Sequence, residues 1–352
     1  HDEVSPAWSP DGSRVAFIRH NGFSSDLVVV ALADGAARVV APARAVRSFP
    51  QWLRDGSAIA FLSSSPTQAA DVWRIAPDGG ELTQLTRSMG RVDPAALSTP
   101  DEVVYRSFDG LEIHALLFKP RAFDPARKHP ALIAIHGGPS SVWDNTYHPF
   151  LQYFAQKGFI VLAPNPRGST GYGKAFEDMN NGDWGGGDLN DILAGDGYLK
   201  SLAYVDPARI GLWGGSYGGF LSYLAVTKAP GRFKASVVRA GMPNLLTSLG
   251  EHTPEERERF AREAGENVNV LRDRSAINFV DRVVTPMLIE IGLRDRSLRV
   301  MQQREWVAAM RARQKIVEYV EYPDEGHGLS TYKATIKDRL IREERFYERY
   351  LK

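Results

Sequence analysis

The sequence predicts an α/β protein with a mostly parallel sheet, preceded by a smaller all-β segment. From about residue 103, short continuous apolar runs alternate with helical patterns, which is typical of a parallel sheet covered by helices on both faces. Before that point, short strands repeat between Asp-Gly turns. We therefore expect two domains, residues 1–102 and residues 103–352.

The first domain contains an internal repeat. Residues 6–17 align with residues 50–61 at a period of 44, and seven of the twelve positions are identical. Each copy reads as a strand, an Asp-Gly turn and a second strand, and further strands and turns follow it. Four short strands in about 44 residues is the size of a β-propeller blade. A weaker third copy is expected from Pro94 to Tyr105.

A propeller closes with roughly four to eight blades, so about two blades form only part of one. We expect the tail of a larger propeller or a shortened propeller; a plain antiparallel β-domain is the alternative. The outer strands of such an array are open edges, which favour a homo-oligomer. The first residue is His rather than Met, which indicates a trimmed chain whose targeting signal would be out of sight.

The second domain is expected to begin with a hairpin of residues 103–107 and 111–118. Six buried strands are then predicted at residues 131–135, 159–163, 210–213, 235–238, 286–291 and 316–319. Helices are predicted at residues 148–157, 188–203, 218–228, 254–264, 299–313 and 331–350. The charged stretch 255–259 is interpreted as a solvated helical face.

Composition excludes several classes of function. The 352 residues include 43 Lys and Arg against 42 Asp and Glu, so the net charge of +1 predicts neither a nucleic-acid nor a membrane partner. The absence of Cys excludes disulfides, thiolate metal sites and a cysteine nucleophile. No metal-binding or phosphate-binding motif is present, so we expect no metal and no cofactor. No apolar run reaches the roughly 18 residues of a membrane span, and we expect a cytoplasmic protein.

The strongest motif is Gly-Gly-Ser-Tyr-Gly-Gly at residues 214–219. It follows the predicted strand 210–213 and opens the predicted helix 218–228, which is the strand–turn–helix context of a nucleophile elbow. Glycines beside Ser216 leave room for a strained turn, and the helix N-terminus supplies free N–H groups. We therefore predict Ser216 as a nucleophile, with a structural glycine-rich turn as the alternative.

A serine hydroxyl needs a base that a third group orients. His327 lies between two glycines after the last predicted strand, and Asp295 follows the strand 286–291, so both occupy loops at strand ends. We expect His327 as the base and Asp295 as its partner. For Asp295 the alternative is a helix N-cap. Other candidates for the acidic role are Asp273, Asp281 and Asp324.

The oxyanion hole of such a site uses the N–H after the nucleophile and one from the loop after the third strand. These requirements point to Tyr217 and Gly138. His136, just before that loop glycine, is interpreted as a brace for the loop rather than as a second base.

Several motifs in order resemble the prolyl oligopeptidase family of serine peptidases, nearest the acylaminoacyl-peptidase branch. They are His136-Gly137-Gly138-Pro139, Asn165–Gly173, Trp184 with Asp188 and Asp191, Gly214–Gly219, Gly292 with Asp295, and Pro323–Gly328. The resemblance implies Ser216 as nucleophile, Asp295 as orienting acid and His327 as base. It also implies an α/β-hydrolase domain beside a β-propeller that limits access to small peptides.

Proline-preferring relatives carry aromatic side chains after the sixth strand, whereas residues 240–246 contain none. We therefore expect a broad apolar pocket, lined by Met242, Leu245, Leu298 and Tyr217. Arg167 and Arg239 are candidate anion contacts, each with a structural salt bridge as the alternative.

Together these features predict a serine peptidase that cleaves short peptides or acyl-peptides through an acyl-enzyme. An esterase or thioesterase of the same fold is the first alternative, because fold does not determine substrate. A non-catalytic interaction protein is the second alternative.

Overall fold

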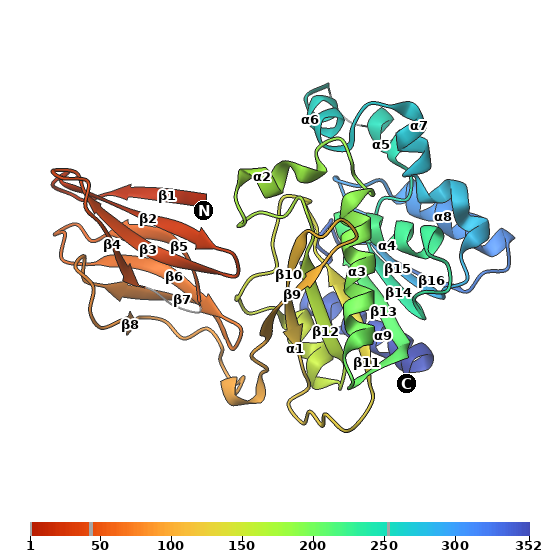
Figure 1. Cartoon of the computed structure of the whole chain (residues 1–352), viewed down its shortest axis with the longest axis horizontal. Coiled ribbons are helices and arrows are strands. Elements are labelled where there is room, and N and C mark those ends of the chain that lie inside the picture. The colour runs from red at the N-terminus through yellow and green to blue at the C-terminus, as the bar shows by residue number, and fades with distance from the viewer. Residues whose placement is uncertain (1, 42–44, 252–253) are drawn as a thin grey trace.

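The computed structural model describes residues 2–41, 45–251 and 254–352, which form three sheets (Figure 1). Two four-stranded antiparallel sheets come first, with strand orders β1-β2-β3-β4 and β5-β6-β7-β8. An eight-stranded, mostly parallel sheet follows in the order β16-β15-β14-β13-β11-β12-β10-β9. The predicted fold class is confirmed.

The two small sheets correspond to the two copies of the sequence repeat. Their strands are β1 (Asp2–Trp8), β2 (Arg14–Asn21), β3 (Ser24–Ala31), β4 (Ala37–Ala41), β5 (Val46–Trp52), β6 (Ile59–Ser65), β7 (Gln68–Ile75) and β8 (Thr83–Gln84). In each copy the turn aspartate, Asp11 or Asp55, accepts a hydrogen bond of 3.0 Å from the serine N–H two residues later. The two sheets pack on each other around Ile18, Leu27 and Ile59.

The segment from Pro94 to Tyr105 is not a third blade, so this prediction was wrong. Its last part belongs to β9 (Asp101–Arg106), which pairs with β10 (Glu112–Phe118) at the edge of the large sheet. Tyr105 is buried there, and its hydroxyl donates to the Asp191 carbonyl oxygen at 3.0 Å. Tyr105 therefore belongs to a core of the large domain, and the predicted domain boundary falls inside β9.

All six predicted parallel strands and all six predicted helices are present. The strands are β11 (His129–Ile135), β12 (Ile160–Asn165), β13 (Val205–Gly215), β14 (Ala235–Arg239), β15 (Met287–Gly292) and β16 (Val317–Tyr322). The helices are α1 (Pro149–Gln156), α3 (Gly187–Ser201), α4 (Tyr217–Lys228), α6 (Pro254–Ala264), α8 (Val300–Ala312) and α9 (Lys333–Leu351). The short helices α2 (Lys174–Glu177), α5 (Leu245–Glu251) and α7 (Val268–Asp273) were not predicted.

Helices cover both faces of the large sheet (Figure 1). Side chains of α3, α4 and α8 join one core, and those of α1 and α9 join the other. Along β11, Ile133 and Ile135 enter the first core, whereas Leu132 and Ala134 enter the second. Because both faces are buried, the strands read as continuous apolar runs, and their carboxyl-end loops gather at one edge of the sheet.

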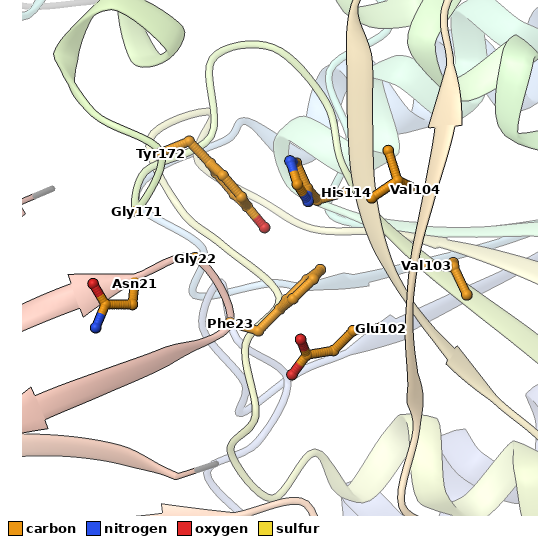
Figure 2. A pocket seen from close by; sticks show the side chains of 9 residues that line it. All are labelled: Asn21, Gly22, Phe23, Glu102, Val103, Val104, His114, Gly171 and Tyr172. Carbon is orange, nitrogen blue, oxygen red and sulfur yellow. The ribbon is translucent and has the colours of Figure 1, made fainter. Parts of the chain in front are cut away.

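The β2–β3 hairpin contacts the large domain beside the edge strands β9 and β10 (Figure 2). The Gly22 N–H donates to the Gly171 carbonyl oxygen at 3.2 Å. The Phe23 ring meets the rings of His114 and Tyr172 edge-on. These residues line a cavity of about 520 Å³, and none of the predicted site residues lines it.

Candidate active site

Ser216 lies on a sharp turn between β13 and α4. Its backbone has φ 56° and ψ −119°, which is rare for a residue with a side chain. The Ser216 N–H donates to the Arg239 carbonyl oxygen on β14 at 2.8 Å, so the neighbouring strand holds the turn. Strained backbone of this kind occurs preferentially at functional sites.

Two glycines make this turn sterically possible. A Cβ atom on Gly214 would lie 2.1 Å from the Gly218 carbonyl oxygen. A Cβ atom on Gly218 would lie 2.2 Å from the Ile135 carbonyl oxygen of β11. The close approach of β13, α4 and β11 around Ser216 therefore requires glycine at both positions.

Asp295 and His327 are 32 residues apart in the chain and in direct contact in the structure. His327 Nδ1 lies 2.7 Å from Asp295 Oδ2. The Asp295 side chain is fully buried, whereas the His327 side chain retains 31% of its accessible surface. The other Asp295 oxygen accepts the N–H groups of Ser297 and Leu298 at 2.8 and 2.9 Å. The carboxylate is thus fixed by the backbone while one oxygen holds the imidazole.

The two loops that carry this pair are pinned to each other. A Cβ atom on Gly292 would lie 2.2 Å from the Glu325 carbonyl oxygen, so only glycine fits there. The same carbonyl oxygen accepts the Arg294 N–H at 2.9 Å. The buried Glu325 carboxylate accepts the N–H groups of Thr331 and Tyr332, each at 3.0 Å, which braces the loop after His327.

The other acidic candidates form separate ion pairs. Asp273, Asp281 and Asp324 pair with Lys228, Arg313 and Arg294, respectively. Among the hydrogen bonds of the described residues, the His327 ring contacts only Asp295. Of the four candidate aspartates, Asp295 is therefore the one in contact with His327.

The two expected oxyanion donors flank Ser216. Tyr217 is the first residue of α4, so its N–H has no acceptor within the helix. Gly138 and Ser216 line the same pocket, and a Cβ atom on Gly137 would lie 3.4 Å from Ser216 Cβ. The loop after β11 therefore lies against the serine, where a carbonyl oxygen could accept both N–H groups.

His136 is buried behind that loop. Its Nδ1 lies 2.7 Å from the Gly137 carbonyl oxygen, and its Nε2 lies 3.0 Å from Ser169 Oγ. Burial lowers the pKa of His136 to about 4, so the ring is neutral at physiological pH. These contacts join the loop to the segment after β12, as expected for a brace.

A pocket of about 130 Å³ lies beside Ser216. Its lining residues are Gly138, Trp184, Ser216, Tyr217, Met242, Arg259, Phe260, Glu263, Ser297 and Leu298. Leu245, which was predicted to line the pocket, is fully buried in the core and is not among the lining residues. It lies at the start of α5, and this short helix was not predicted.

The sequence reasoning missed the contribution of α6 to this pocket. Phe260 is 5% exposed and meets the Trp184 ring edge-on, with 5.5 Å between the ring centroids. The signal was present, because Phe260 is the one aromatic residue in the otherwise charged stretch 254–264.

Arg167, which was a candidate anion contact, is also absent from the residues that line the pocket. Its guanidinium donates to both oxygens of the buried Asp191 at 2.9 Å, and also to Asp109 at 2.9 and 3.0 Å. All of these acceptors belong to the protein. The structural salt bridge, which was the alternative for this residue, is the arrangement observed.

The Tyr217 ring forms one wall of the pocket and is held at its far end. Its hydroxyl donates to the buried carboxylate of Asp188, and Asn180 Nδ2 donates to that hydroxyl at 3.2 Å. Burial raises the pKa of Asp188 to about 6. This anchor fixes the ring of the residue that is expected to supply one of the two oxyanion donors.

Within residues 2–41, 45–251 and 254–352, no group of three or more His, Cys, Asp and Glu side chains could hold a metal ion. None of the helices described is long and apolar enough to cross a membrane.

Comparison with known proteins gives consistent matches. Residues 146–352 match the family model of the prolyl oligopeptidase family. The uncharacterized peptidase YuxL of Bacillus subtilis is 30% identical over 338 residues, covering 93% of this chain and 50% of the relative. The acylamino-acid-releasing enzyme of Sus scrofa is 27% identical over 345 residues, covering 92% of this chain and 47% of that protein.

Two solved structures share the fold. The Pyrococcus horikoshii acylaminoacyl peptidase superposes with a TM-score of 0.85 at 25% identity, over 96% of this chain and 55% of that chain. A puromycin-hydrolyzing peptidase of Mycobacterium tuberculosis gives a TM-score of 0.91 at 24% identity, over 99% of this chain and 54% of that chain. The chain spans about half the length of the curated relatives that it matches. By its sequence and its fold, this chain belongs to the prolyl oligopeptidase family.

Proposed function

We propose that this chain is the catalytic part of a serine peptidase that hydrolyses short peptides or acyl-peptides through an acyl-enzyme. The observation that carries the proposal is the 2.7 Å contact between His327 and the buried Asp295, on loops at the same sheet edge as the strained Ser216. The names of the acylamino-acid-releasing and acylaminoacyl peptidase relatives support the substrate class.

In the proposed reaction, His327 Nε2 removes the Ser216 hydroxyl proton as Oγ attacks the substrate carbonyl carbon. The carbonyl oxygen becomes an oxyanion that accepts the N–H groups of Tyr217 and Gly138. Collapse breaks the C–N bond, and the imidazolium gives its proton to the leaving amine. Water then attacks the acyl-enzyme while His327 takes its proton, which releases the acid and restores Ser216.

Asp295 makes this proton transfer efficient by fixing the imidazole. A carboxylate on Nδ1 keeps the proton on that nitrogen, so Nε2 is free to act as base. The same carboxylate stabilises the imidazolium that forms. Because backbone N–H groups hold its second oxygen, the carboxylate cannot turn away from the ring.

The pocket beside Ser216 suits an apolar side chain on the residue that supplies the scissile carbonyl. Trp184, Tyr217, Met242, Phe260 and Leu298 provide its apolar walls, and its volume is about 130 Å³. We expect medium-sized apolar side chains to be preferred over charged ones, since a methylene fitted into such a pocket changes specificity by about 1–3 kcal/mol.

The test is Ser216→Ala, compared with Ser201→Ala at the exposed end of α3. Assays use a chromogenic N-acyl amino-acid amide, the matching p-nitrophenyl ester and a fluorophosphonate label. We expect Ser216→Ala to lose on the order of 10⁴–10⁶-fold in kcat and to lose the label, while the control keeps both.

The outcomes separate the alternatives. Hydrolysis that survives Ser216→Ala overturns the proposal. Ester turnover without amide turnover favours the esterase or thioesterase alternative. A wild-type chain that neither reacts with the label nor hydrolyses either substrate favours the non-catalytic alternative.

A further inference from the structure

The ion pair of Arg167 and Asp191 joins two segments that border the candidate active site. Arg167 lies in the loop after β12, and Asp191 lies near the start of α3. The backbone N–H, Nε and Nη2 of Arg167 donate to the two carboxylate oxygens of Asp191, each at 2.9 Å. The Asp191 side chain is fully buried, and that of Arg167 keeps 11% of its surface. Parallel N–H···O bonds of this kind fix both the distance and the orientation of the two groups.

Other protein groups complete the surroundings of the pair. The Ser107 hydroxyl donates to Asp191 Oδ1. Asp109, which is more exposed, accepts the outer N–H groups of the guanidinium at 2.9 and 3.0 Å. Both carboxylate oxygens of Asp191 are therefore occupied by protein donors, so the pair holds segments together rather than binding a substrate.

On one side of the pair, α3 supports the Tyr217 ring. Asp188 lies three residues before Asp191, is fully buried and accepts a hydrogen bond from the Tyr217 hydroxyl. The N–H groups of Gly185 and Leu189 hold the two Asp188 oxygens at 3.2 and 2.7 Å. A shift of the first turn of α3 would therefore move the support of Tyr217, the first residue of α4.

On the other side of the pair, the loop after β12 is bonded to the loop after β11, which carries Gly138. The Thr170 N–H donates to the Ser141 carbonyl oxygen at 3.0 Å. The Asn165 side chain accepts the Trp143 N–H at 2.7 Å and donates to the Trp143 carbonyl oxygen at 2.9 Å. The histidine brace described above adds a further contact between the same two loops. A shift of the loop after β12 would therefore move the loop of Gly138.

Glycines allow the loop after β12 and the segment before α3 to approach each other closely. A Cβ atom on Gly187, the first residue of α3, would lie 2.6 Å from Arg167 Cδ. A Cβ atom on Gly168 would lie 2.3 Å from the Asn180 side chain, and Asn180 itself donates to the Tyr217 hydroxyl. The loop after β12 thus packs directly on groups that hold the Tyr217 ring.

We propose that Arg167 and Asp191 are positioning residues that set the separation of the two expected oxyanion donors, the N–H groups of Tyr217 and Gly138. Hydrogen bonds and short chain segments run continuously from the Gly138 loop through this pair to the Tyr217 ring. Two donors stabilise one oxyanion only when both lie at hydrogen-bond distance from the same oxygen. The inference rests on the proposed function, because it concerns the oxyanion of that reaction.

The first test is Asp191→Asn, compared with Asp206→Asn, whose carboxylate pairs with Arg209 near the amino end of β13. Asparagine keeps the size of the side chain but offers a single acceptor oxygen to the guanidinium. We expect kcat of Asp191→Asn to fall by about 10²-fold with little change in KM, since a small misplacement of catalytic groups has this cost. Asp206→Asn should keep the wild-type kcat. Steady-state kinetics on the chromogenic N-acyl amino-acid amide provide the measurement.

A second pair of variants leaves every charge in place. Gly187→Ala should push Arg167 away from Asp191, whereas the added Cβ of Gly197→Ala, in the same helix, meets nothing within 4 Å. Both changes replace a helical glycine with alanine, so a difference in kcat reports the displacement of Arg167. We expect Gly187→Ala to lose between about tenfold and 10²-fold in kcat. This pair decides the role if Asp191→Asn does not fold.

The affinity for a transition-state analogue separates positioning from a general loss of structure. Ser216 Oγ adds to the carbonyl carbon of a peptidyl trifluoromethyl ketone, His327 takes the hydroxyl proton, and the carbonyl oxygen becomes an oxyanion. The corresponding alcohol fills the same pocket but forms no oxyanion. We expect Asp191→Asn and Gly187→Ala to weaken inhibition by the ketone by the same factor as kcat/KM, and to leave inhibition by the alcohol unchanged.

Each outcome bears on a different claim. Equal weakening of the ketone and the alcohol overturns the positioning role. Values of kcat in Asp191→Asn and Gly187→Ala that match those of their controls also overturn it, while the proposed function stands if the wild type hydrolyses the substrate. A wild-type chain that neither hydrolyses the substrate nor binds the ketone overturns the proposed function and, with it, this role.

Discussion

The two N-terminal sheets and the eight-stranded sheet are held together by different kinds of contact. In the small sheets every strand pairs with its neighbour in the chain, and the shared core is small. Large aromatic side chains remain exposed there, since Trp8 keeps 64% and Phe49 keeps 66% of its surface. In the large sheet, β11 pairs with β13 although α1, β12, α2 and α3 lie between them in the chain, and both faces of the sheet are buried.

This difference explains why the candidate active site lies in the large sheet. A hairpin places residues together that are already close in sequence, whereas a parallel sheet gathers the ends of distant strands at one edge. The candidate site lies at such an edge, with Ser216, Asp295 and His327 from three separate loops. The N-terminal sheets contribute no residue to the pocket at Ser216.

The largest expected effect on kcat comes from replacing Asp295, which contacts His327 although the two are 32 residues apart in the chain. Asp295→Asn should lower kcat by about 10⁴-fold, because an amide at this position favours the wrong tautomer of His327. The matched change in the N-terminal sheets is Asp55→Asn, which affects only a local turn and should leave kcat unchanged. Steady-state kinetics on both variants provide the measurement. A loss below tenfold in Asp295→Asn would falsify the assignment of this carboxylate.

Core truncations compare the stability of the two regions. Leu212→Ala in β13 and Leu27→Ala in β3 each empty a fully buried site, so each should cost about 2–5 kcal/mol of unfolding free energy. We expect Leu27→Ala to preserve kcat, since its core contains no residue of the large sheet. The measurement is urea unfolding of both variants, monitored by tryptophan fluorescence and by the enzymatic activity that remains. Equal loss of activity in both variants would mean that the two regions unfold as one unit.

A glycine substitution tests the contact between the two loops of the candidate site. Gly292→Ala would place Cβ 2.2 Å from the Glu325 carbonyl oxygen, so it should separate Asp295 from His327 and lower kcat about 10²-fold. Gly197→Ala is the control, because nothing lies within 4 Å of its added Cβ in α3. That control should stabilise the protein by roughly 0.5–1 kcal/mol. Similar kinetics in both variants would contradict the steric argument.

The smallest predicted effect is a pH dependence. Because burial raises the pKa of Asp188 from 3.8 to about 6, its folded form binds a proton that the unfolded chain has lost. The stability from this group is present below about pH 4 and is lost as pH rises through 6, by up to about 1.4 kcal/mol per pH unit. Asp188→Asn should flatten the stability profile in this window, whereas Asp34→Asn in an exposed N-terminal turn should not. Unfolding curves between pH 4 and 7 distinguish the two, and a steep profile in Asp188→Asn would refute the explanation.

Sequence reasoning succeeded where the determining contacts are local. The repeated Asp-Gly turns fixed the two small sheets, and continuous apolar runs marked each buried strand of the large sheet. It failed in assigning residues 94–105 to a third blade. The competing prediction, a hairpin of residues 103–107 and 111–118 at the start of the second domain, matches the observed pairing of β9 with β10.

The same distinction between local and long-range contacts applies to the candidate site. The glycine spacing around Ser216 could be read from the sequence, since steric limits at a turn are local. The lining of the pocket could not, because α6 brings Phe260 beside Trp184 from 76 residues away. For the same reason Leu245 was misplaced and Arg167 was open to two interpretations, which depended on whether Asp191 lay within reach.

The fold class, the glycine-rich turn at Ser216 and four candidate aspartates for the partner of His327 could be read from the sequence. The contact between His327 and Asp295, rather than another of these aspartates, is visible only in the assembled fold. Hydrophobic periodicity and turn sterics act over a few residues. Hydrogen bonds and buried charges depend instead on distances that are set when the whole sheet assembles.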